Sequence, residues 1–185
     1  MPDITRDHVA HAVAAAGIDQ AAFRDALSTF ASGVTVLTTV DASGQKYGIT
    51  ASSFTSLSID PPLVLICVAR SAYSYAAFEE SRHFGISVLH DGQADLATRY
   101  AVQGGAKFLD DEYAIDGRTG VPLIRAALTT LLCSTHEVMP GGDHGILIGA
   151  VEDVATHAGL PLVNYARELT TVQVGGGSRT HAFGR

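Results

Sequence analysis

The sequence has 185 residues and a mass of 19.3 kDa; 46 % of the residues are hydrophobic and 17 % are charged. A chain of this length usually forms one domain, and its share of apolar residues excludes an intrinsically disordered protein. The net charge of −7 disfavours nucleic-acid binding, because an acidic surface repels a phosphate backbone. The mean hydropathy of +0.20 indicates apolar surface beyond the core, which favours a homo-oligomer.

No segment predicts a membrane or secretory protein. The longest apolar run, Leu63–Ala69, is far shorter than the ~20 residues of a membrane-spanning helix. Residues 1–17 lack the basic start and the apolar middle of a secretory signal. We therefore expect a cytoplasmic protein in which Cys67 and Cys133 are reduced and buried as small hydrophobic residues.

Residue patterning predicts three parts along the chain. Residues 1–18 predict an N-terminal helical extension, 19–170 the folded domain, and 171–185 a flexible glycine-rich tail. The domain is expected to open with a helix that follows Asp19 and ends at Gly33. The apolar stripe of this helix is Phe23, Leu27 and Phe30.

The rest of the domain is predicted to consist mainly of strands. Alternating residues from Gly33, the turn over residues 41–44 and the returning segment Tyr47–Phe54 predict a hairpin. The run Leu63–Ala69 predicts a strand buried on both faces. Further strands are expected at Phe84–Leu89, Ile124–Met139, His144–Thr156 and Leu162–Tyr165, helices at about Ser71–Ser81 and Asp91–Val102, and an irregular segment at Gln103–Pro122. This order does not fit parallel βαβ winding and predicts a small antiparallel barrel.

Small hydroxyl side chains are concentrated in the segment Thr50–Ser56. Small side chains let a ligand approach the backbone closely, and hydroxyl groups add donors and acceptors for a planar polar cofactor. The alternative is an exposed edge strand or loop that is simply rich in Ser and Thr. The position of the segment favours a ligand site, because the rigid Pro61-Pro62 pair and the most apolar run of the chain follow it.

A second candidate is the start of the helix near Ser71–Ser74, directly after Arg70. Free N–H groups at a helix N-terminus attract phosphate, and serine and arginine side chains add donors. The alternative is ordinary helix capping by serine.

The third candidate is the turn Gly142-Asp143-His144, with Gly149 five residues after His144. Glycines allow a ligand to approach the turn closely, and His144 offers a hydrogen-bond donor at the entrance of a strand. The alternative is a solvated turn. A metal site is not expected, because His136 and His144 lack further ligands at a recognisable spacing.

Taken together, five motifs resemble the short-chain flavin reductase family, the NAD(P)H:flavin oxidoreductases of two-component flavin monooxygenases. In chain order they are FASGVTVLTT at residues 30–39, GITASSF at 48–54, SIDPPL at 58–63, FGISVL at 84–89 and GDHGILIG at 142–149. The resemblance covers about residues 23–165. It implies a mainly β fold, a Greek-key antiparallel split β-barrel with a few flanking helices, that binds FMN or FAD as a homodimer.

The resemblance also implies roles for individual residues. Flavin ring and ribityl contacts fall on Thr50, Ala51, Ser52, Ser53 and Ser58, phosphate contacts on Ser71, Ser74 and Lys107, and nicotinamide contacts on Gly142, Asp143 and His144. The segment after Pro161-Leu162 departs from the family pattern, which leaves the role of Tyr165, a further nicotinamide candidate, open.

The implied activity is reduction of FMN or FAD by NADH or NADPH, with release of reduced flavin to a separate monooxygenase. The two reacting rings must lie about 3–3.5 Å apart, and His144 is the expected catalytic residue, positioning the nicotinamide. Two alternatives remain: a flavoprotein that keeps its flavin and acts directly on a small organic substrate, and a non-catalytic flavin-binding or electron-transfer module. The residues do not decide between FMN and FAD or between NADH and NADPH.

Overall fold

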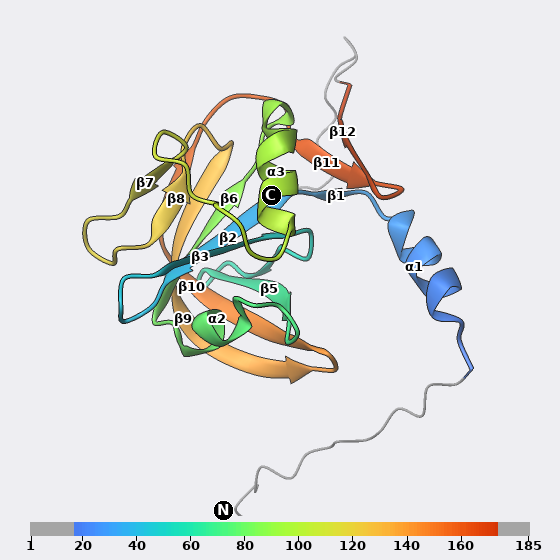
Figure 1. Cartoon of the computed structure of the whole chain (residues 1–185), viewed down its shortest axis with the longest axis horizontal. Coiled ribbons are helices and arrows are strands. Elements are labelled where there is room, and N and C mark those ends of the chain that lie inside the picture. The colour runs from blue at the N-terminus through green and yellow to red at the C-terminus, as the bar shows by residue number, and fades with distance from the viewer. Residues whose placement is uncertain (1–16, 174–185) are drawn as a thin grey trace, which may run out of the picture.

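The structure is a computed structural model that describes residues 17–173. The helix predicted within residues 1–18 and most of the predicted tail therefore lie outside the described residues. The helices are α1 (Gln20–Ser28), α2 (Tyr75–Glu80), the 3₁₀ helix η1 (Asp91–Gln93) and α3 (Ala94–Ala101). The strands are β1 (Ser32–Gly33), β2 (Thr35–Val40), β3 (Lys46–Ala51), β4 (Thr55–Ser58), β5 (Leu63–Ala69), β6 (His83–Val88), β7 (Tyr113–Ile115), β8 (Pro122–Ile124), β9 (Thr129–Gly141), β10 (His144–Thr156), β11 (Leu162–Tyr165) and β12 (Glu168–Thr171) (Figure 1).

The body of the domain is a seven-stranded antiparallel sheet in the order β3-β2-β6-β9-β10-β5-β4. The sheet curls so that its end strand β3 approaches β5, the second strand from the other end. Ser53 Oγ, just after β3, donates to the Cys67 carbonyl oxygen of β5 (3.1 Å) and accepts from the Cys67 N–H (3.0 Å). Because β3 and β5 form no ladder of their own, the sheet is a split barrel, and the predicted mainly β, antiparallel split-barrel fold is confirmed.

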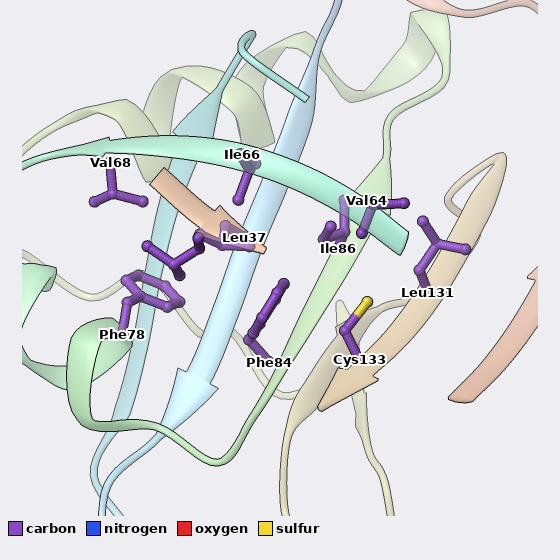
Figure 2. Packing of buried hydrophobic residues seen from close by; sticks show 10 residues of the cluster. Leu37, Val64, Ile66, Val68, Phe78, Phe84, Ile86, Leu131 and Cys133 are labelled. Carbon is purple, nitrogen blue, oxygen red and sulfur yellow. The ribbon is translucent and has the colours of Figure 1, made fainter. Parts of the chain in front are cut away.

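Two hydrophobic clusters hold the sheet in this shape. The first fills the interior of the barrel, where Phe78 of α2 and Phe84 of β6 are fully buried against the inward face of β5 (Figure 2). Burial raises the pKa of the Cys133 thiol in this cluster to about 12, so the thiol stays protonated. The second cluster joins β2 to α3, with Val36 and Tyr100 both at 0 % exposure.

The prediction that Leu63–Ala69 is buried on both faces is wrong. Val64, Ile66 and Val68 are buried, whereas the alternate residues are only half-buried. Successive side chains of a strand point to opposite faces, and β5 lies one strand from the edge of the sheet. Cys67 is consequently half-buried rather than buried, while Cys133 is buried as expected.

The first helix begins as predicted and ends early. The Asp19 carboxylate caps α1 by accepting from the N–H groups of Ala21 and Ala22, but the helix ends at Ser28 rather than Gly33. None of its residues is buried, and Phe30 of the apolar stripe is 78 % exposed. Figure 1 shows α1 standing apart from the barrel, beside β11 and β12.

The hairpin β2–β3, the strands β6 and β11, and the long hairpin β9–β10 confirm the predicted order of elements. The predicted strand Ile124–Met139 is divided, because β8 ends at Ile124 and β9 begins at Thr129. The short strands β1, β4, β7 and β12 were not predicted, since two to four residues are too few to show a period. Within residues 17–173, no helix has both the length and the apolar character needed to cross a membrane.

Candidate functional site

A cavity of about 500 Å³ lies in the split of the barrel. Its walls are the β2–β3 turn with the first half of β3, the segment Ala69–Ser74 after β5, and the loop Ala101–Phe108 after α3. Backbone and side chains from these three segments therefore face the same space. A concave site with a few convergent polar groups is the usual setting for a small-molecule ligand.

The cavity favours an anion. Two lysines line it and none of its lining residues is acidic, although the chain carries a net charge of −7. Lys107 Nζ donates to the carbonyl oxygens of Gly48 and Tyr100, both at 3.0 Å. An ammonium has three donors, so one N–H of Lys107 is left for a ligand. Burial lowers the pKa of Lys107, because removing water disfavours the charged ammonium. An anionic ligand beside the ammonium offsets this cost of desolvation.

Two of the predicted phosphate contacts, Ser71 and Ser74, also line the cavity. The predicted helix begins later than expected, at Tyr75, and Ser74 occupies its N-cap position. Its hydroxyl makes no capping hydrogen bond, so the capping alternative is not realised in the structure. Ser71, Ser74 and Lys107, which are far apart in the sequence, therefore face one space.

The hydroxyl run Thr50–Ser56, which begins within β3, serves the fold as well as any ligand. Thr50 Oγ1 donates to the Ala97 carbonyl oxygen of α3 (2.6 Å), and Ser53 Oγ ties β3 to β5. Ser52 is exposed, and Ser58 pairs with Leu63 in the β4–β5 ladder. Ile49 is the last residue of β3 that lines the cavity. Thr50 and Ala51 follow it in the same strand, so the hydroxyl run lies directly beyond the cavity.

The turn between β9 and β10 places His144 beside the cavity. Gly142 has φ +67°, the left-handed conformation that glycine adopts without strain. His144 pairs in register with Ala69, a cavity-lining residue, and the Arg70 N–H donates to the Asp143 carbonyl oxygen (2.9 Å).

The His144 ring is oriented by its neighbour, because Nδ1 lies 2.7 Å from Asp143 Oδ1. This hydrogen bond holds the pKa of the Asp143 carboxyl below its usual value. We assign the Nδ1–H tautomer on that basis, which leaves Nε2 free to accept a hydrogen bond from a ligand.

Two glycines of the GDHGILIG segment serve packing rather than ligand approach. A Cβ on Gly145 would lie 2.6 Å from the Tyr75 hydroxyl oxygen, so Tyr75 packs directly on the backbone beside His144. Gly149 is buried against Phe84 in the barrel core. No local pattern predicts the contact with Tyr75, because only the fold brings α2 against β10.

We expect Gly149→Ala to destabilise the protein. The added Cβ would lie 2.5 Å from Phe84 Cζ and 2.9 Å from Cys133 Cβ, and overpacking of a core costs about 1–3 kcal/mol. Denaturant titration should show this loss in the free energy of unfolding. Gly117→Ala is the control, since a Cβ there meets nothing within 4 Å. Equal stability of the two variants would contradict the packing assignment.

Tyr165 does not join the other predicted residues. It lies in β11, within the small sheet β1-β11-β12, is 50 % exposed and does not line the cavity. Two tyrosines that sequence reasoning did not place at a site, Tyr47 and Tyr73, line the cavity instead.

Comparison with known proteins agrees with this geometry. The sequence model of the flavin reductase like domain matches residues 27–173. The chain belongs to this family. It is 38 % identical over 168 residues to the actinorhodin polyketide dimerase of Streptomyces coelicolor, covering 90 % of this chain and 94 % of the relative. It is also 38 % identical over 151 residues to the NADH:riboflavin 5'-phosphate oxidoreductase of Streptomyces pristinaespiralis, covering 80 % of this chain and 86 % of that one.

Solved structures of the family have the same fold. The NADH:FAD oxidoreductase SgcE6 of Streptomyces globisporus, in complex with NAD and FAD fragments, superposes with a TM-score of 0.80 at 32 % identity, covering 86 % of this chain and 96 % of that one. Several further relatives, at 34–38 % identity, are named as reductase components or subunits of monooxygenases.

Proposed function

We propose that this protein is an NAD(P)H-dependent flavin reductase, which transfers hydride from a reduced nicotinamide to FMN or FAD. The observation that carries the proposal is a cavity without acidic residues, lined by Lys107, Ser71 and Ser74, with His144 beside it. These groups fit a phosphate-bearing flavin, because serine hydroxyls and an ammonium are phosphate donors. Membership of the flavin reductase family supports the same activity.

The residues of the chain hold the reactants in place. A bound flavin supplies the hydride acceptor, and the nicotinamide supplies the donor. Lys107, Ser71 and Ser74 bind the flavin phosphate, and the segment Thr50–Ser53, with Ser58, borders the ring and the ribityl chain. Thr50 and Ser53 do this mainly through backbone groups, because their hydroxyls already bond within the fold.

His144 orients the nicotinamide. Its free Nε2 accepts a hydrogen bond from the carboxamide, while Asp143 fixes the ring from the other side. Gly142 gives the turn the shape that allows this approach. No nucleophile is needed, since proximity and orientation supply much of the rate enhancement when two rings react directly.

Steady-state kinetics test this function. NADH or NADPH consumption should rise with added FMN or FAD and saturate, because the flavin is a substrate that leaves after reduction. Reduced flavin released in this way would supply a separate flavin-dependent monooxygenase, a partner class supported by the relatives that are monooxygenase reductase components. If no NADH or NADPH is consumed at any flavin concentration, the reductase activity is refuted. The non-catalytic flavin-binding module is then the function that remains.

A second candidate is direct action on an organic substrate with retained flavin, favoured by the relative named as a polyketide dimerase. In that case purified protein would keep flavin through gel filtration, and free flavin would not accelerate NADH consumption.

Tyr165, which lies outside the cavity, is kept as a nicotinamide contact only if Tyr165→Phe raises the KM for NADH.

A homodimer is part of the proposal, because the apolar stripe of α1 has no cover within the described chain. Phe23 and Leu27 are 54 % and 58 % exposed, and burying such side chains stabilises an interface by about 1.5–3 kcal/mol each. The helix is held to the body through the Ser28 carbonyl oxygen and an ion pair between Asp25 and Arg167.

We expect Leu27→Glu to shift the protein from dimer to monomer in sedimentation equilibrium. A charge in the centre of an apolar interface opposes association, because it would be buried without a partner. Ala21→Glu adds the same charge on the opposite face of α1, away from Phe23 and Leu27, and should leave the dimer intact. A wild-type protein that sediments as a monomer would refute the dimer.

A further inference from the structure

The cavity contains an aromatic pair. Tyr47 of β3 and Tyr73 of the β5–α2 segment both line it, with ring centroids 6.0 Å apart and planes tilted by 34°. Tyr73 is 75 % exposed, so its ring is accessible to a ligand in the cavity.

The two rings differ in how firmly they are held. Tyr47 is half-buried, and its hydroxyl donates to Asp41 Oδ2 at 3.1 Å, so its ring has a fixed position. The Tyr73 side chain is exposed, and it makes no hydrogen bond within residues 17–173. Its ring is therefore free to rotate over a ligand. One fixed ring and one adjustable ring suit the stacking of a flat aromatic group.

The order of groups along β3 indicates what that flat group is. The hydroxyl run begins at Thr50, the Gly48 carbonyl oxygen binds Lys107, and Tyr47 comes next. A strand rises about 3.3 Å per residue, so Tyr47 lies about 10 Å along β3 from Thr50. A flavin with its ring at the hydroxyl run and its phosphate at Lys107 therefore points whatever follows the phosphate toward Tyr47.

FMN ends at its phosphate, whereas FAD continues with a second phosphate and adenosine. We propose that Tyr47 and Tyr73 form an adenine-stacking site and that this protein binds FAD in preference to FMN. Lys46 also lines the cavity, with its Nζ over the Tyr113 ring at 5.1 Å from the ring centroid. This inference rests on the proposed flavin reductase function, and it assigns the flavin that the sequence left open.

Binding measurements on the full chain test the site. Titration calorimetry with FAD and with FMN should show FAD binding more tightly by about 5- to 150-fold, the range expected for one stacked base. Tyr73→Ala should remove that advantage and leave the Kd for FMN within about twofold. Tyr73→Phe keeps the ring and should keep the preference for FAD. Because Tyr73 is exposed, loss of folding is not expected, and near-UV circular dichroism checks it.

The competing outcomes are distinct. Equal affinities for FAD and FMN in the wild type, or an equal loss of both in Tyr73→Ala, would overturn the adenine site while the reductase function stands. A raised KM for NADH in Tyr73→Ala, with the Kd for FAD unchanged, would assign the pair to the adenine of the nicotinamide coenzyme and also overturn the proposal. Absence of binding for both flavins would refute the proposed function itself.

Discussion

Lys107→Met should weaken FMN binding by about ten- to a hundredfold, because a hydrogen bond to a charged group contributes about 1.5–3 kcal/mol. The lysine is placed for this role by the carbonyl oxygens of Gly48 and Tyr100, which occupy two of its three donors. Methionine keeps most of the aliphatic volume and removes the charge. Fluorescence titration of FMN measures the change in Kd.

Riboflavin, which lacks the phosphate, is the control for this variant. The loop Ala101–Phe108 loses a tether to β3 when Lys107 is replaced, and riboflavin reports the effect of that loss alone. We expect its affinity to fall only a few-fold. If riboflavin and FMN lose affinity equally, Lys107 acts by holding the loop, and the phosphate contact is wrong.

His144→Ala should lower kcat/KM for NADH by about tenfold or more, which corresponds to about 1.4 kcal/mol of transition-state stabilisation. The reason is the loss of the acceptor that Asp143 orients toward the nicotinamide. The KM for NADH should rise and the rate of flavin reduction should fall, as measured by stopped-flow absorbance. The Kd for flavin should change little, because His144 lies beside the cavity and does not line it.

Asp143→Asn separates orientation from contact. The amide can still accept from His144 Nδ1–H, so we expect a smaller loss of kcat/KM than in His144→Ala. The Asp143 side chain is 93 % exposed, so this variant should fold normally. A loss of flavin affinity in His144→Ala as large as its loss of kcat/KM for NADH would show that His144 is wrongly assigned to the nicotinamide.

The sequence by itself determined the longer strands, the main turns and the family. The strand Thr35–Val40 and the turn at Gly142 depend on local rules, namely the strand preference of β-branched residues and the left-handed conformation of glycine, so they could be predicted without a structure. The same holds for the cap at Asp19. Local composition also indicated Ser71, Ser74 and His144, because their side chains carry hydrogen-bond donors and acceptors.

Only the tertiary structure decided which groups are free for a ligand. The Thr50 and Ser53 hydroxyls resemble ligand contacts in the sequence, yet both bond to backbone carbonyl oxygens from distant segments. Lys107 meets Gly48, and Tyr47 meets Tyr73, only because the split sheet brings β3, the end of β5 and the loop after α3 around one space. Hydrogen-bond satisfaction and burial depend on every neighbour in space, and a linear pattern carries no record of those neighbours.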